Sequence, residues 1–153
     1  MVDFNTVEGI QVDIDKKDKV IEMLGDPEYV SEYEVDENLT WEYLKYTSKG
    51  LLFTIKKSNQ LVEVISIYGS NYYVLDGANR QYYTTYPYDL PYGWKLKQTT
   101  MNSVVDKEGN PNLIRSSERL RSYQYESLDA WYRFYSDSEG DYSGKEIVSV
   151  TIY

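Results

Sequence analysis

The side chains that could do chemistry in this chain are carboxylates, lysines, tyrosines and hydroxyl residues, because its 153 residues include no cysteine and no histidine. This composition excludes a thiol nucleophile, an imidazole base, a disulfide and a metal site built on Cys or His. The 25 acidic residues offer many carboxylate pairs of the kind glycosidases use, but no spacing singles out two of them. We therefore expect a binding module in place of an enzyme, with no cofactor and no metal.

Carboxylates are concentrated in one stretch of the first half. Eight acidic residues and no Lys or Arg lie between Glu22 and Glu42, in a chain whose net charge is −9. We predict an acidic loop over residues 28–42 that could attract a basic protein partner; a solvated loop with no partner is the alternative. The acidic balance argues against direct nucleic-acid binding, which needs basic patches facing the phosphates.

The elements that must position these residues follow from an internal repeat. Gly9, Val20, Gly25 and Pro27 recur 84 residues later as Gly93, Val104, Gly109 and Pro111, without a gap. Both copies close on a similar β-rich run, at residues 62–68 and 147–153. We predict one repeat over residues 1–68 and another over 93–153. The residues between them, 69–92, contain seven tyrosines and form a linker or a bridging hairpin.

Each repeat is predicted to contain two helices followed by an antiparallel meander. The first helix places Val20, Ile21 and Leu24 on one apolar face and ends at Gly25. A second short helix is expected near residues 29–33, and near 113–120 in the other copy. The predicted fold class is α+β, with two tandem helix–loop–helix plus antiparallel-sheet repeats joined by a Tyr-rich linker. The predicted strands are residues 40–46, 51–56, 61–68, 121–127, 131–135 and 147–153.

Alternation along these strands divides their side chains between a core face and an opposite face. The predicted core residues are Trp41, Tyr43, Leu51, Phe53, Ile55, Ile65, Ile67, Tyr123, Tyr125, Tyr132, Phe134, Val150 and Ile152. The opposite face is predicted to carry Glu42, Tyr46, Leu52, Thr54, Tyr68, Gln124, Trp131, Arg133, Tyr135 and Tyr153. Its aromatic, weakly charged composition is typical of protein interfaces, although the same tyrosines could instead pack against the linker.

The motif Val20-Ile21-x-x-Leu24-Gly25-Asp26-Pro27, followed by Trp41-Glu42-Tyr43 and the run from Leu51 to Ile55, resembles a known repeat. It is similar to the repeat of the β-lactamase-inhibitory proteins and of the SmpA/BamE outer-membrane assembly lipoproteins. Two tandem copies over nearly the whole chain resemble the inhibitory proteins more. The resemblance implies two helix–loop–helix plus sheet units whose sheets join in a concave surface that grips a partner enzyme.

Together, these features predict a non-enzymatic inhibitor or immunity-type protein that neutralises a toxin, nuclease or other enzyme through its sheet face and acidic loop. A cell-envelope accessory domain related to SmpA/BamE, a module that sequesters a nucleotide or sugar, and a carboxylate enzyme remain as alternatives. No run is long and apolar enough for a membrane span, so we expect a cytoplasmic protein, or else an exported one whose leader is missing. The predicted partner-binding residues are Glu34, Asp36, Glu37, Glu42, Tyr46, Tyr68, Trp131, Arg133, Tyr135 and Tyr153.

Overall fold

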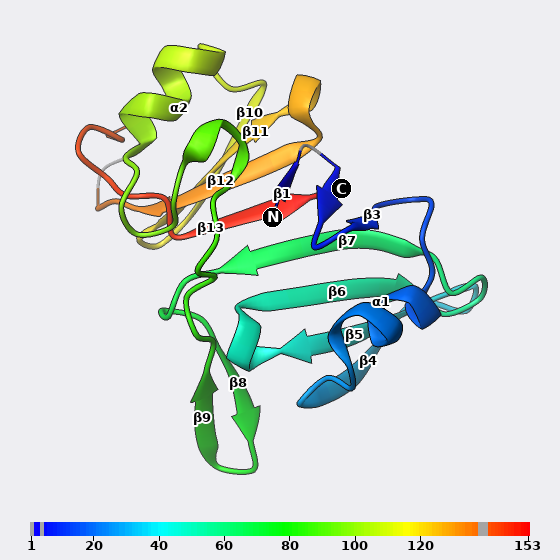
Figure 1. Cartoon of the computed structure of the whole chain (residues 1–153). Helices are drawn as coiled ribbons and strands as arrows, with labels where there is room; N and C mark the ends of the chain where they lie inside the picture. Colours follow the sequence, from blue (N-terminus) through cyan, green and yellow to red (C-terminus); the bar gives the residue numbers. More distant parts are fainter. Residues whose placement is uncertain (1, 4, 138–140) are drawn as a thin grey trace.

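A single antiparallel sheet of eight strands forms the centre of the protein (Figure 1). The computed structural model describes residues 2–3, 5–137 and 141–153. The strands lie in the order β10-β11-β12-β13-β7-β6-β5-β4, so strands of the second half occupy one side of the sheet and strands of the first half the other. Their bounds are β4 Tyr29–Asp36, β5 Leu39–Tyr46, β6 Leu51–Lys56, β7 Val62–Tyr68, β10 Leu113–Ser117, β11 Leu120–Tyr125, β12 Ala130–Tyr135 and β13 Ser149–Ile152.

Two short α-helices pack on one face of this sheet. Helix α1 spans Lys17–Leu24 and buries Val20, and helix α2 spans Met101–Glu108 and buries Met101 and Val104. Each has eight residues, and no helix in the described part of the chain is long and apolar enough to cross a membrane. Single 3₁₀ turns lie at Thr47–Lys49, Pro91–Gly93 and Glu126–Leu128.

Two smaller β-structures accompany the main sheet. Strands β1 Val2–Asp3, β2 Thr6–Val7 and β3 Ile10–Gln11 form a three-stranded sheet whose Val7 and Ile10 are buried in the common core. Strands β8 Tyr73–Asp76 and β9 Asn79–Tyr82 form a hairpin within the tyrosine-rich segment between the repeats. Figure 1 shows this hairpin projecting away from the body of the protein.

The predicted α+β fold class, with two helix–loop–helix repeats, is wrong. Among the described residues each repeat has one α-helix, and the segments expected to form second helices are extended: residues 29–33 lie within β4, and residues 113–120 run through β10 into β11. Tyr29, Val30, Tyr33 and Ile114 are β-favouring residues, which gives both segments a preference for extended structure. Both segments pair in register with the next strand and become the two edges of a mostly β fold.

The two halves meet at a seam that has approximate two-fold symmetry. Strand β7 pairs with β13, and Ser66 stands directly opposite Thr151. These two residues occupy the same position in the two copies of the closing run, 85 residues apart. Their hydroxyl oxygens are 3.4 Å apart. The repeats therefore share one sheet and do not form separate domains.

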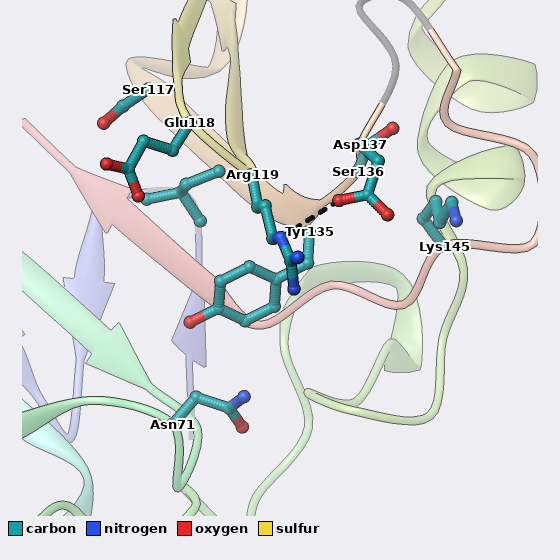
Figure 2. Close-up of a pocket in the computed structure, with 9 residues that line it drawn as sticks. Asn71, Ser117, Glu118, Arg119, Tyr135, Ser136, Asp137 and Lys145 are labelled. Carbon is teal, nitrogen blue, oxygen red and sulfur yellow. Dashed lines mark ion pairs between the residues drawn. The ribbon is translucent and has the colours of Figure 1, made fainter.

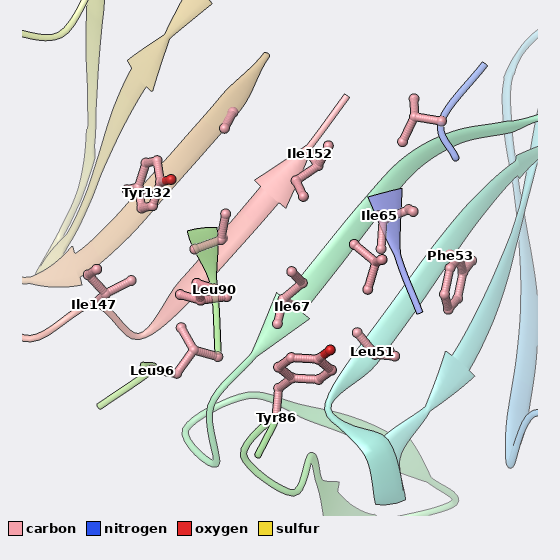
Figure 3. Packing of buried hydrophobic residues seen from close by; sticks show 14 of the residues in the cluster. Leu51, Phe53, Ile65, Ile67, Tyr86, Leu90, Leu96, Tyr132, Ile147 and Ile152 are labelled. Carbon is pink, nitrogen blue, oxygen red and sulfur yellow. The ribbon is translucent and has the colours of Figure 1, made fainter. Parts of the chain in front are cut away.

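A common hydrophobic core joins both halves on the helix-covered face (Figure 3). Leu51, Phe53 and Ile67 contribute from the first half, and Tyr132 and Ile152 from the second. Between them lie buried residues of the segment that follows the β8–β9 hairpin, so this segment is part of the core and not a free linker. These residues are Tyr86, Leu90, Trp94 and Leu96.

Most residues predicted for the core are buried, but β5 faces the other way. Cross-strand partners share a face of the sheet. Glu42 pairs with Ile55 and Tyr46 pairs with Leu51, so both point toward the helices, while Trp41 and Tyr43 point away. Both alternating sets of residues in β5 contain large apolar side chains. The prediction was wrong because it assigned the set with Trp41 and Tyr43 to the core, while the structure buries the set with Leu44 and Tyr46.

Candidate functional site

The face of the sheet opposite the helices is largely uncovered, and we call it the open face. The residues that flank the β8–β9 hairpin, Tyr72 and Tyr83, pack against its middle, where both rings contact Tyr68 of β7. By strand alternation and pairing, the open face includes Tyr29, Ser31, Tyr33, Trp41, Tyr43, Lys45, Leu52, Thr54, Lys56, Val64, Ser66, Tyr68, Leu113, Arg115, Ser117, Leu120, Ser122, Gln124, Trp131, Arg133, Tyr135, Ser149 and Thr151.

Three tyrosines anchor the hairpin to the centre of the open face. The rings of Tyr68 and Tyr72 stack with centroids 4.5 Å apart, and Tyr83 lies against Tyr68 at 4.7 Å. The hydroxyl groups of Tyr72 and Ser149 are hydrogen-bonded at 3.1 Å, and the Tyr83 amide donates to the Tyr72 carbonyl at 2.8 Å. Burial raises the pKa of Tyr72 to about 12 and raises the pKa of Tyr68 and Tyr83. The hairpin therefore leaves the sheet from a fixed aromatic base.

Two adjoining grooves lie beside this base. Both are lined by Tyr43, Leu52, Tyr68 and Tyr72. The groove toward the seam, of about 370 Å³, is also lined by Trp41, Thr54, Val64, Ser66, Arg133 and Thr151. The groove toward the hairpin, of about 300 Å³, is also lined by Ser31, Lys45, Tyr73, Val74 and Tyr83.

The charged residues lining the two grooves, within the part of the chain that is described, are Lys45 and Arg133. Arg133 Nη1 donates to Thr151 Oγ1 at 2.5 Å, which holds its guanidinium over the seam. Burial lowers the pKa of Lys45, which is the direction expected for an ammonium group removed from water. The grooves therefore combine aromatic walls with two positive charges.

Five of the predicted site residues lie together on or beside the open face. Tyr68 and Arg133 line its grooves, and Trp131 lies next to Arg133 along the face, with the Arg115 guanidinium 5.2 Å from its ring centroid. Tyr135 is 39% exposed at the end of β12. Tyr153 follows β13, and its hydroxyl accepts a hydrogen bond from Gln124 Nε2 at 2.6 Å.

The other five predicted site residues are not on the open face. Glu34 and Asp36 lie on the edge strand β4, and Glu37 lies in the turn after it, so the expected acidic loop is mostly a strand. Glu42 faces α1 and forms an ion pair with Lys17 at 2.7 Å. Tyr46 is buried on the helix face, where its hydroxyl donates to the Gly25 carbonyl at 2.8 Å. Glu42 and Tyr46 thus have structural contacts with the helical layer.

The sequence prediction missed Trp41, Tyr43 and Lys45, which line the grooves from β5. Alignment of the two repeats could have shown which face these residues occupy. Tyr46 and Ser48 match Tyr125 and Ser127 with a spacing of 79 residues, which differs from the spacing of 84 between the helices. This alignment assigns Tyr46 to the core, as it does its counterpart Tyr125, and turns Trp41 and Tyr43 outward. No local pattern indicates Tyr72 and Tyr83, because tertiary packing brings them there.

A larger cavity of about 570 Å³ lies at the far end of β12 (Figure 2). It is lined by polar residues, including Asn71, Tyr135 and Lys145, and contains an ion pair between Arg119 and Asp137 at 3.2 Å. The side chains of this pair are 79% and 82% exposed, so water weakens their interaction. Among the described residues, no group of three or more acidic side chains is placed to hold a metal ion. This cavity has the character of an open polar surface.

Comparison with known proteins identifies the fold. No protein-family model matches the sequence, and no curated protein matches it. The fold is similar to the crystal structure of a DUF4309 family protein, YjgB, from Bacillus subtilis subsp. subtilis str. 168. The TM-score is 0.52 and the identity 16%, over 96% of this chain and 84% of that one. An extracellular protein containing an SCP domain, from Bacillus anthracis str. Ames, matches with a TM-score of 0.48 and 12% identity, over 99% of this chain and 45% of that one. The similarity to YjgB concerns the fold alone.

Proposed function

We propose that this protein binds a partner protein through the open face of its sheet and acts as an inhibitor or immunity-type protein, without catalysis of its own. The observation that carries the proposal is the contrast between the two faces of one sheet. Helices, the small sheet and the returning segment cover one face, while the other presents aromatic grooves to solvent. Half-buried aromatic residues around a partly buried arginine are enriched at protein interfaces.

The inhibitor class comes from the sequence resemblance to the β-lactamase-inhibitory proteins. Of what that resemblance implies, the joined sheets are present, while the helix–loop–helix units are not found in the described residues. The partner class is a toxin, a nuclease or another enzyme. We place this binding in the cytoplasm as part of the same proposal, with export as the alternative, and fractionation of the native host's cells distinguishes the two.

The proposal is tested with the full chain immobilised and exposed to a lysate of its native host. A partner should be captured by the unmodified protein and by Tyr88→Ala, which changes an exposed tyrosine outside the open face. Capture should fail with the double variant Trp131→Ala, Tyr135→Ala. Calorimetry with the purified partner should show weakening by about 2 kcal/mol, or about thirtyfold, for the double variant. Equal affinity of both variants would exclude the open face as the interface.

A second candidate function is sequestration of a small ligand such as a nucleotide or sugar. The two adjoining grooves favour it, because aromatic rings stack on both ligand classes. A panel of nucleotides and oligosaccharides should then raise the melting temperature of the unmodified protein but not that of Tyr43→Ala. A panel in which no compound shifts the melting temperature removes this candidate and leaves the protein-binding proposal intact.

A further inference from the structure

The charge on the open face is opposite in sign to the charge of the whole protein. The chain has a net charge of −9, yet strand pairing places Lys45, Lys56, Arg115 and Arg133 on this face. Carboxylates reach this face from Glu63 of β7, whose Oε2 accepts a hydrogen bond from Trp41 Nε1 at 2.9 Å, and from Asp76 of the hairpin, which interacts with Tyr29 opposite Lys45. The acidic residues of β4 and β5 lie at the sheet edge or toward α1. Local potential on the open face therefore favours an anionic partner.

The two cations that line the grooves lack a carboxylate partner within the described residues. The ion pairs of this region use other residues, Lys17 with Glu42 and Lys57 with Glu32. Lys45 and Arg133 are both partly buried, and neither forms an ion pair with another residue in the described part of the chain. Removing a charge from water without a counter-charge costs free energy. A partner that supplies carboxylates would recover this cost on binding.

One buried polar group near the hairpin, the Tyr83 hydroxyl, also lacks a hydrogen bond within the described residues. The Tyr83 side chain lines the groove toward the hairpin and is 3% exposed, and its hydroxyl has no hydrogen-bond partner among the described residues. A buried hydroxyl without a partner carries a desolvation cost. Tyr83 and Lys45 line the same groove. Both groups can donate hydrogen bonds, and a carboxylate accepts them without donating any.

We propose that the open face receives an extended acidic segment of a partner protein, with one carboxylate bound by Arg133 and a second by Lys45. This inference rests on the proposed function and specifies the chemistry of the partner. Four strand spacings separate β5 from β12, roughly 19 Å in all, which an extended chain spans in about six residues. Arg133 offers the forked donors that bind a carboxylate, and Tyr43, Tyr68 and Tyr72 form an aromatic surface between the two charges. A basic segment would be repelled at both ends.

The experiment selects peptides of about 12 random residues, long enough to cross the sheet, on the full-length protein. The selected peptides should share two Asp or Glu residues separated by about five to seven positions. A synthetic copy of the best peptide should bind Arg133→Gln at least about tenfold more weakly than the unmodified protein, with a smaller dependence on salt. Arg133→Gln keeps a donor for Thr151, and Arg119→Gln, at an exposed arginine outside the grooves, is the matched control that should bind within about twofold.

The outcomes separate this inference from the proposed function. Selected peptides without paired acidic residues, or equal binding to Arg133→Gln, would overturn it. So would free glutamate or phosphate that competes at the peptide's own affinity, since this would mark a small-anion site. Suppose that the double variant Trp131→Ala, Tyr135→Ala loses the native partner while Arg133→Gln retains it. The open face is then the interface, but the proposal that it binds an acidic segment is wrong. Suppose instead that acidic peptides bind through Arg133 while the double variant retains the native partner. The open face then binds acidic segments, but the proposal that it binds this partner is wrong.

Discussion

Tyr46 in the first repeat and Tyr125 in the second occupy equivalent positions and make the same hydrogen bond. Each is buried, and each donates its hydroxyl to the carbonyl of the glycine that ends the preceding helix, Gly25 at 2.8 Å and Gly109 at 3.0 Å. Both tyrosines are followed by a 3₁₀ turn and then by a strand. The two repeats therefore share the hydrogen bond that connects the end of the helix to the sheet.

The repeats differ at the residue that ends the 3₁₀ turn. It is Gly50 in the first repeat and Asp129 in the second, with φ values of 69° and 47°. A side chain at position 50 would collide with the Thr84 carbonyl oxygen and the Tyr86 amide, because the segment returning from the hairpin crosses there. That segment hydrogen-bonds to the first repeat through Thr84 N and Thr47 O at 2.7 Å. The segment returning from the hairpin therefore packs against the 3₁₀ turn of the first repeat.

Replacement of this glycine gives the largest effect that we expect. Gly50→Ala should destabilise the protein by about 3 kcal/mol or more, because backbone strain and a steric clash act together. Asp129→Ala, at the equivalent position, should cost less than about 1 kcal/mol. Urea unfolding of both variants measures the free energy of unfolding. Equal costs would show that the returning segment does not pack on the first repeat.

Removal of the shared hydroxyl groups gives a smaller effect. Tyr46→Phe and Tyr125→Phe should each lower the free energy of unfolding by about 1–2 kcal/mol, because each leaves a helix-end carbonyl without its donor. The two costs should be similar and should add in the double variant, since the sites have no shared partners. Chemical denaturation checks this, with Tyr88→Phe at an exposed position as the control. Strongly unequal costs would contradict the equivalence of the two helix connections.

The smallest effect concerns Lys45 and its counterpart in the second repeat, Gln124. Burial holds the pKa of Lys45 below its usual 10.5, so folding disfavours the charged form. Lys45→Met should therefore stabilise the protein at pH 7, by less than about 1 kcal/mol. The gain should be constant below the folded-state pKa and should shrink as the pH rises toward 10.5, where the unfolded state also loses its proton.

Gln124→Met supplies the matched comparison for Lys45→Met. It should destabilise the protein slightly, because Gln124 donates to the Tyr153 hydroxyl, and the effect should not change with pH. Thermal unfolding of both variants at neutral and alkaline pH measures the difference. A Lys45→Met variant that is less stable than the unmodified protein at pH 7 would show that Lys45 already has a compensating partner.

The strands of the sheet were predictable from the sequence where they are buried, and not where they are exposed. The predicted segment 51–56 matches β6, and those at 40–46 and 61–68 match β5 and β7 to within a residue. Strands β4 and β10 were expected to be helical because they form the edges of the sheet, where exposed side chains give no clear alternation of polar and apolar residues. The prediction of the fold class was wrong because these two strands were expected to be helices.

Prediction of the candidate site failed at one strand, β5, whose two faces were assigned the wrong way round. Arg133, Trp131 and Tyr68 could be assigned to the open face because their strands alternate clearly. Trp41 and Tyr43 could not, since β5 has large apolar residues on both faces, and only comparison with Tyr125 decides between them. The positive charge of the open face was hidden by the overall charge of −9, which describes the composition of the chain and not the direction in which each side chain points.

The pairing of Ser66 with Thr151 at the centre of the sheet has a consequence for the ancestry of this protein. Two identical subunits joined by an antiparallel strand pair across a two-fold axis would place each residue 66 against its own copy. The seam between β7 and β13 thus has the form of an isologous dimer interface contained within one polypeptide. A single chain removes the requirement that both subunits change together. Residues such as Arg133, whose counterpart is Thr54, could then arise on one side of the axis only, which allows one end of a bound partner to be distinguished from the other.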